Sequence, residues 1–169
     1  MTPADLHAAL RDRFGDAVRE LHEATDPWIE IAADAVPDVL TFLRDEHRLR
    51  HLNDLTAVDF APRPGDKGKY EGEPRLEVVY RLSDFPLTQS HTLKVVLPRG
   101  TNDDLPEVPS ASGIFPIAEW HERETFDLLG VRFTGHPNLC RILTSDDWVG
   151  HPLRKDYEMP EEYGGIRCR

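Results

Sequence analysis

Two apolar segments, RLEVVYRL at residues 75–82 and HTLKVVL at residues 91–97, decide the fold class of this chain. In the first segment Leu76, Val78 and Tyr80 alternate onto one face, which is typical of a β-strand. The connection between the segments is short, so we predict that they pair as antiparallel strands. A further strand is predicted at residues 51–60, followed by an exposed connection rich in Pro, Gly and Lys at residues 62–74.

Helical spacing precedes these strands in the chain. Val36, Val39, Leu40 and Leu43 lie at i, i+3, i+4 and i+7, which predicts an amphipathic helix over residues 35–49. The other predicted elements are a helix at residues 3–14, a hairpin of residues 16–23 and 28–32, and a helix at residues 115–129 that ends at Gly130.

This order of elements predicts an α+β fold. We expect residues 1–130 to form a two-layer domain in which a mixed β-sheet packs on helices. From residue 131 to residue 169 the helical and strand periods both fade, while Gly, Pro, Trp and Arg recur. Irregular segments of that length are uncommon unless they are functional or held by something else. We therefore expect an extended, irregular C-terminal strap that packs on a partner, with a plain surface loop as the alternative.

Composition and charge exclude several classes of protein. Asp and Glu outnumber Lys and Arg by 31 to 20, and the resulting net charge of −11 argues against nucleic acid as a partner. The two cysteines form no closely spaced framework, which fits a reducing compartment. The sequence has neither a secretory signal nor an apolar run of the roughly 18–20 residues that a membrane span needs. Any attachment to a membrane is therefore expected to go through another protein.

The densest charged segment, EWHERETFD at residues 119–127, invites an enzymatic interpretation. It does not match the zinc motif His-Glu-x-x-His, because Thr125 occupies the place of the second histidine. His136 and Cys140 have ligand-like spacing, but two ligands do not make a closed metal site. The sequence also lacks a nucleophile elbow, a dinucleotide or phosphate loop, and the thiolates of an iron–sulfur cluster. We therefore predict no catalytic, cofactor-binding or metal-binding residues.

Glu122 falls within the apolar stripe of the predicted helix at residues 115–129. A carboxylate there must be paired or neutralised, and three ways are open. An arginine of the tail, Arg141 or Arg154, could pair with it; so could an arginine of a partner protein. Glu122 could instead be protonated and act as a general acid. A soluble hydrolase that uses Glu122 or Glu124 is accordingly the rival from a different functional class.

A second row on the same helix contains Glu119, Arg123 and Asp127 at i, i+4 and i+8. We predict that this row faces solvent and supports the helix through an ion pair. In the tail, tryptophan, arginine and proline are typical of an interface segment. The candidates for partner contacts or structural ion pairs are Glu122, Arg123, Glu124, His136, Arg141, Trp148, His151, Arg154 and Lys155.

Three ordered motifs resemble one known family. ERETFDLLGVRF at residues 122–133 is followed by GHPNLCRIL at residues 135–143 and DWVGHPLRKDY at residues 147–157. These motifs are similar to the signature of the 30-kDa subunit of NADH:quinone oxidoreductase, respiratory complex I. Weaker similarity extends back to about residue 35.

The resemblance implies a non-catalytic subunit in the peripheral arm of a proton-pumping respiratory complex, at the cytoplasmic face of the inner membrane. Such a subunit docks on the large subunit that frames the quinone site, while FMN and iron–sulfur clusters lie in partner subunits. The isolated chain is then expected to be inactive. Equivalent subunits of membrane-bound hydrogenases and ferredoxin-linked complexes share much of the motif, so they are the alternative within the family.

Overall fold

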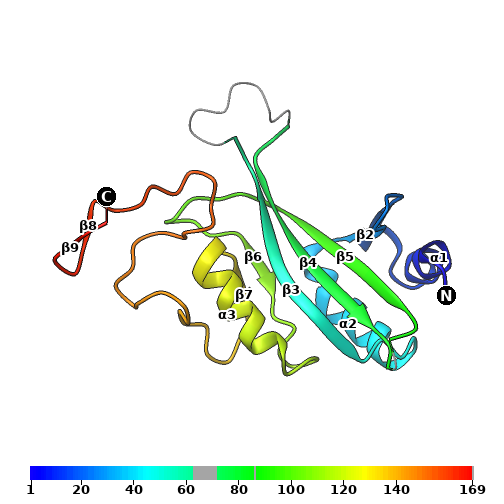
Figure 1. Cartoon of the computed structure of the whole chain (residues 1–169). Helices are drawn as coiled ribbons and strands as arrows, with labels where there is room; N and C mark the ends of the chain where they lie inside the picture. Colours follow the sequence, from blue (N-terminus) through cyan, green and yellow to red (C-terminus); the bar gives the residue numbers. More distant parts are fainter. Residues whose placement is uncertain (63–71, 86, 169) are drawn as a thin grey trace.

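The computed structural model describes residues 1–62, 72–85 and 87–168 and confirms an α+β fold (Figure 1). Most of the predicted connection at residues 62–74 lies outside the described residues. A five-stranded sheet with the order β1-β2-β5-β4-β3 forms the centre of the molecule. Its strands are β1 (Val18–His22), β2 (Trp28–Ile31), β3 (His51–Phe60), β4 (Arg75–Ser83) and β5 (Ser90–Pro98).

The sheet is mixed, as predicted. β4 pairs antiparallel with β3 and with β5, so that Val78 lies opposite Ala57 on one side and Val95 on the other. β2 pairs antiparallel with β1 but parallel with β5, with Ile29 opposite Leu93. The N-terminal hairpin therefore joins the sheet beside a strand that comes much later in the chain.

Alternation along the strands places one face of the sheet in the core. The inward positions are almost all apolar and buried, which supplies the main favourable contribution to folding. Asp59 is an exception, because it continues the inward series of β3 yet carries a carboxylate, and it is 4% exposed. The inward side chains of the three longest strands are Leu52, Leu55, Ala57, Asp59, Leu76, Val78, Tyr80, Leu82, His91, Leu93, Val95 and Leu97.

Two helices precede the third strand. α1 (Pro3–Phe14) begins at a capping box in which Thr2 and Asp5 exchange hydrogen bonds. α2 (Val36–Asp45) buries the predicted stripe but ends four residues before the predicted limit of residue 49. It stops there because the chain turns, and Arg48 adopts a left-handed conformation with φ 59°.

α3 (Ala118–Leu129) lies beside β3 at the edge of the sheet (Figure 1). It begins three residues later than predicted, because Phe115 belongs to a turn whose carbonyl accepts the amide hydrogen of Ala118. Two short pairings flank the helix. β6 (Glu107–Pro109) runs parallel with β7 (Arg132–Thr134), while β8 (Glu162–Tyr163) and β9 (Ile166–Arg167) form a hairpin near the C-terminus.

Candidate functional site

The carboxylate of Asp127 is the anchor of the C-terminal segment. It is fully buried on α3 and accepts hydrogen bonds from the backbone amides of Ile142, Leu143 and Thr144 at 2.7–3.0 Å. The guanidinium of Arg141 lies 2.7 Å from the same carboxylate. Three consecutive amides turned toward one anion form a backbone nest. Residues 141–144 therefore wrap around the end of α3 instead of extending away from it.

These hydrogen bonds decide the charge of Asp127. Burial by itself raises the pKa of this carboxyl, but the hydrogen bonds from the Thr144 hydroxyl and from the backbone outweigh burial. The pKa consequently lies far below its ordinary value, and the group is ionised. The prediction that Glu119, Arg123 and Asp127 form a solvent-facing row is wrong for Asp127. Within the described residues, the predicted ion pair of Arg123 with Glu119 is also absent, because the guanidinium donates to the carbonyls of Cys140 and Arg141 instead. The 100° spacing places it beside Arg123 on the helix surface, but the returning tail covers that surface.

Three side chains of the tail complete the C-terminal end of α3. Arg141 donates to the carbonyl of Asp127 at 3.1 Å, and Arg154 donates to the carbonyls of Leu129 and Gly130 at 2.8 and 3.1 Å. The last carbonyls of a helix lack partners within the helix and carry partial negative charge, so arginines are suited to this place.

His151 supplies the third cap. Its Nδ1 lies 2.9 Å from the carbonyl of Asp127, and because a carbonyl only accepts, Nδ1 carries the hydrogen. Burial lowers the pKa of this imidazole, which keeps the ring neutral. The ring packs on Gly130, which ends the helix with φ 68°, and a Cβ there would lie 2.5 Å from ring atom Cδ2. This position therefore requires glycine for two reasons.

Glu122 is buried, as its place in the apolar stripe predicted, but its partners are not the predicted ones. Its carboxylate accepts the hydroxyl hydrogen of Ser110 and the amide hydrogen of Ala111, both at 2.6 Å. Arg141 and Arg154 instead bind the far end of α3, so pairing with a tail arginine is contradicted. Burial, opposed by these two hydrogen bonds, raises the pKa of Glu122 to about 7.

The remaining candidates on α3 and after β7 have separate environments. Arg123 stacks on Trp120 and donates to the carbonyls of Cys140 and Arg141. Glu124 is exposed. His136 is buried, and its Nε2 lies 3.0 Å from the carbonyl of Glu119 and 4.0 Å from the Glu122 carboxylate. His136 and Glu122 are the one close acid–base pair among these candidates, and because both side chains are fully buried, the pair is not open to a substrate.

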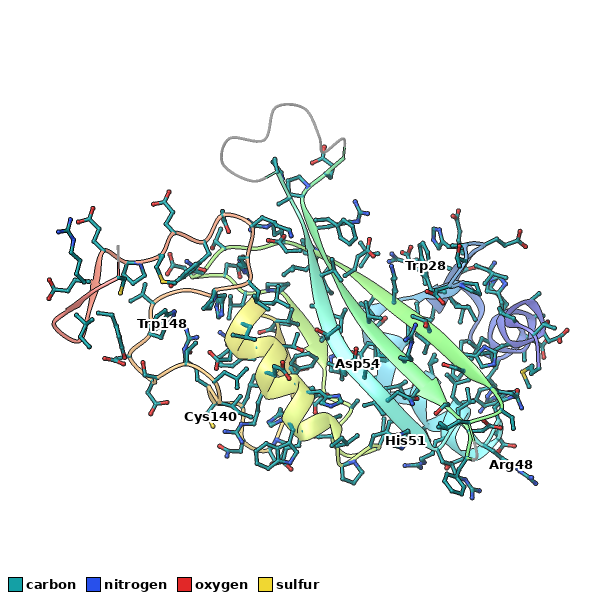
Figure 2. All side chains as sticks on the ribbon, in the orientation of Figure 1. Trp28, Arg48, His51, Asp54, Cys140 and Trp148 are labelled. Atoms are coloured by element: carbon teal, nitrogen blue, oxygen red, sulfur yellow. The ribbon has the colours of Figure 1, made fainter. Side chains whose placement is uncertain are left out.

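Farther along the tail, aromatic packing folds the segment on itself. Trp148 lies against the ring of Tyr163 with a centroid distance of 4.8 Å, and the Tyr163 hydroxyl donates to Asp147 at 2.7 Å. Figure 2 shows Trp148 and Cys140 on the C-terminal segment next to α3. Lys155 is partly buried, and its backbone amide donates to Asp59 at 2.8 Å.

Sequence reasoning missed the second anchor of the tail, Arg99. Its guanidinium bridges the carboxylates of Asp59 and Asp156, with nitrogen–oxygen distances of 2.5–2.9 Å. Those two partners raise its pKa above the ordinary arginine value, Asp156 most of all. An available signal was the inward position of Asp59 in the alternation of β3. A charged residue at a core position requires a partner, and here the partner joins the sheet to the tail.

Between its anchors and beyond them, the tail presents apolar side chains to the surface. Arg141 and Arg154 hold the backbone, while the apolar side chains next to them are exposed. Exposed hydrophobic groups gathered on one segment are typical of an interaction surface. They are Leu143 (61% exposed), Val149 (83%), Leu153 (56%), Met159 (44%) and Ile166 (73%).

Two kinds of feature are absent from residues 1–62, 72–85 and 87–168. None of the helices there has the length and hydrophobicity that crossing a bilayer requires. Nor do those residues contain a group of three or more His, Cys, Asp or Glu side chains arranged to hold a metal ion.

Relatives among known proteins match most of the chain. Residues 29–163 match the family described as "Respiratory-chain NADH dehydrogenase, 30 Kd subunit". The chain is 44% identical to an NADH-quinone oxidoreductase subunit of Roseiflexus sp. (strain RS-1), across 90% of this chain and 82% of the relative. It is 42% identical to the protein of the same name from Moorella thermoacetica, across 86% of this chain and 89% of the relative.

One solved structure shares the fold. A chain of the membrane-bound sulfane sulfur reductase, described as an archaeal respiratory membrane complex, superposes with a TM-score of 0.61. The match covers 92% of this chain and 85% of that one at 22% sequence identity. At this level of identity the likeness concerns the fold alone.

Proposed function

We propose a function from the premise that this chain belongs to the family of the respiratory-chain NADH dehydrogenase 30 Kd subunit, whose members include NADH-quinone oxidoreductase subunits. The chain acts as a non-catalytic subunit in the peripheral arm of a proton-pumping NADH:quinone oxidoreductase. Electrons pass from NADH through FMN and iron–sulfur clusters of other subunits to a quinone. This subunit sits at the cytoplasmic face of the inner membrane and contributes surface instead of chemistry.

The partner that it docks is the large subunit framing the quinone site, and the docking surface is the C-terminal segment. The observation that carries this proposal is the double anchoring of residues 141–156 by Asp127 and Arg99. Ordering a segment before it binds reduces the entropy lost on association. The anchored segment leaves Val149 and Leu153 exposed, where they can enter an apolar surface of a partner.

The geometry favours this proposal over a hydrolase. Glu122 is fully buried and engaged by Ser110 and Ala111, so it has no access to a substrate in solution. Glu124 is exposed, and no hydrogen bond or ion pair joins it to a histidine within the part of the chain that the structure describes. The equivalent subunit of a hydrogenase or a ferredoxin-linked complex is the alternative, because the family resemblance extends to those complexes.

The test is affinity purification of the tagged chain from gently solubilised membranes of its source organism. We expect flavin and iron–sulfur subunits in stoichiometric amounts, iron–sulfur absorbance, and NADH-dependent reduction of a quinone. The double variant Val149→Ser/Leu153→Ser should lose these subunits while remaining folded, because both side chains are exposed. Val58→Ser, on an exposed position of β3, is the matched control and should retain them. Hydrogen-dependent activity would favour the alternative, and a chain that purifies alone would contradict both.

A further inference from the structure

A second surface lies where α2 ends and the β4–β5 turn begins. It is a corner formed by His47, Arg48, Arg50, Phe85 and Leu87. Figure 2 shows Arg48 at the end of the molecule away from Cys140 and Trp148, so this corner is remote from the tail. The corner encloses a hollow of about 590 Å³, which is lined by His47, Arg48, Arg50, Asp84, Phe85 and Gln89.

The two arginines of the corner are available to a ligand. Leu49 between them is buried, whereas Arg48 and Arg50 are both exposed. The amide of Arg50 donates to the carbonyl of Arg48 at 2.9 Å, which closes a tight turn around the buried leucine. Within the described part of the chain, no hydrogen bond or ion pair engages either guanidinium. Unpaired arginines on a fixed turn are suited to bidentate recognition of a carboxylate.

The apolar half of the corner is equally exposed. Phe85 is 91% exposed and Leu87 63% exposed, on a turn that is internally braced. The carboxylate of Asp84 accepts the Thr88 hydroxyl at 2.5 Å and the Gln89 amide at 2.8 Å. Asp84 is thus committed to its own turn and forms no ion pair with the arginines. The turn therefore presents a large aromatic group to solvent beside two guanidinium groups that form no hydrogen bond or ion pair within the described residues. The hydrogen bond from Arg44 lowers the pKa of the Asp45 carboxyl, and Arg50 lies near enough to add to that lowering.

Backbone strain gathers at the same place. Among the described residues, only Arg48 (φ 59°) and Leu87 (φ 73°) are non-glycine residues with positive φ. This conformation is unfavourable for an L side chain and persists where the surroundings enforce it, often at binding sites. Arg48 lines the hollow itself, and Leu87 lies on the turn between two of its lining residues, Phe85 and Gln89.

We propose that this corner docks a segment of a partner protein in which a carboxylate side chain lies next to an apolar one. The carboxylate binds Arg48 and Arg50, and the apolar group packs on Phe85. Charge complementarity argues for a protein and against a membrane. Two arginines are fewer than the cluster of 4–8 basic residues typical of lipid binding, and the net charge of −11 repels an anionic surface. This proposal rests on the proposed function, because it assumes that the chain is a subunit of a larger complex. The chain would then contact one neighbour through the C-terminal segment and another through the corner.

The test is photo-crosslinking in the assembled complex. The full chain, with Phe85 replaced by p-benzoylphenylalanine, substitutes for the normal subunit in the source organism. After irradiation of the isolated complex, mass spectrometry identifies the linked peptide. We expect a peptide of another subunit with Asp or Glu close to the linked residue. The double variant Arg48→Glu/Arg50→Glu should lower the yield at least fivefold, and changing the partner's carboxylate to lysine should restore it.

Several controls make the outcome decisive. Arg13→Glu reverses an exposed arginine near the end of α1 and should leave the yield unchanged. If the double variant does not fold, the crosslinking yield of the Phe85-substituted chain is measured across roughly 50–500 mM salt, where an arginine–carboxylate contact weakens. A lipid adduct, a link to a second copy, a peptide without a carboxylate, no adduct, or a yield indifferent to charge and salt would overturn the proposal. The purification of the Val149→Ser/Leu153→Ser variant tests the C-terminal segment independently of the crosslink at Phe85. Failure of the proposed function and failure of the corner proposal can therefore be distinguished.

Discussion

The imidazole of His151 lies against Gly130, so close that a Cβ there would come within 2.5 Å of the ring. The contact joins two motifs, because the two residues lie 21 positions apart in the chain. It also defines how the tail is seated, because the same ring donates to the carbonyl of Asp127. Four predictions concern the contacts that hold the tail on α3 and the buried charges near them.

The first prediction concerns Gly130→Ala. The methyl group adds a clash with the His151 ring to the strain of a φ of 68°, so we expect a loss of about 3–5 kcal/mol of unfolding free energy. Gly135→Ala is the matched control, since its φ is 80° but nothing lies within 4 Å of the added Cβ. The control should lose only about 1–2 kcal/mol. Urea denaturation of the purified chain gives both values, and equal losses would show that the ring contact is unimportant.

Asp127→Asn should detach residues 141–144. An amide cannot satisfy three backbone amides and a guanidinium as a carboxylate does, and Arg141 would lose its buried partner. We expect a loss of about 3–5 kcal/mol. Limited proteolysis should then cleave between β7 and Trp148, while the sheet remains intact. Glu124→Gln, on the exposed side of the same helix, should change neither stability nor cleavage. Resistance to protease in the Asp127 variant would disprove the anchoring role.

The pH dependence of stability should carry the signature of Glu122. The pKa of this group in the folded state is raised to about 7, above the unfolded value near 4.5. Its contribution is therefore fully present below pH 4.5 and is lost as the pH rises through 7. Relative to Glu122→Gln, the wild-type chain should lose up to about 3 kcal/mol between roughly pH 5 and pH 8. The pKa of Asp127 is lowered, so its contribution to stability has the opposite pH dependence and is lost as the pH falls into the acid range. Parallel stability curves for wild type and Glu122→Gln would exclude a raised pKa.

Arg99→Gln should leave Asp59 charged and without its guanidinium partner in the core. We expect a loss of about 3 kcal/mol, together with faster hydrogen exchange at the Lys155 amide, which donates to Asp59. Adding Asp59→Asn should recover part of the loss, because the uncompensated charge disappears. Arg19→Gln removes an arginine from an exposed pair with Glu30 and serves as the control. If the Lys155 amide exchanged at its original rate in the Arg99 variant, the bridge would not hold the tail.

The fold could be predicted from local patterns, because the apolar period of each element reflects which face it buries. Val36 to Leu43 predicted α2, and the alternation through Leu76, Val78 and Tyr80 predicted β4. The parallel pairing of β2 with β5 was out of reach, since no local pattern records which strands become neighbours. The end of α2 was also misplaced, because the left-handed turn at Arg48 has none of the usual signals of a glycine or proline.

The site was harder to predict from the sequence, because its geometry depends on how the tail folds back over α3. The helical period correctly placed Glu122 in the core, yet gave no means to choose its partners from residues 12 positions earlier, such as Ser110. Asp127 seemed exposed because α3 alone leaves it exposed. Arg141 and Arg154 were recognised as important residues, but both were assigned to Glu122, whereas Arg141 binds Asp127 and Arg154 binds the last carbonyls of α3. Long-range pairing, not residue identity, was what local spacing could not supply.

The parallel contact between β2 and β5 has a consequence for biosynthesis. During translation, residues 32–89 must be made before the N-terminal hairpin can meet the strand beside which it belongs. At roughly 5–20 residues per second, the hairpin waits several seconds with one hydrogen-bonding edge unpaired. An unpaired edge of this kind can capture other strands. Nascent chains should thus be most vulnerable to aggregation in this interval, and a chaperone that shields the N-terminal hairpin would be of greatest use then.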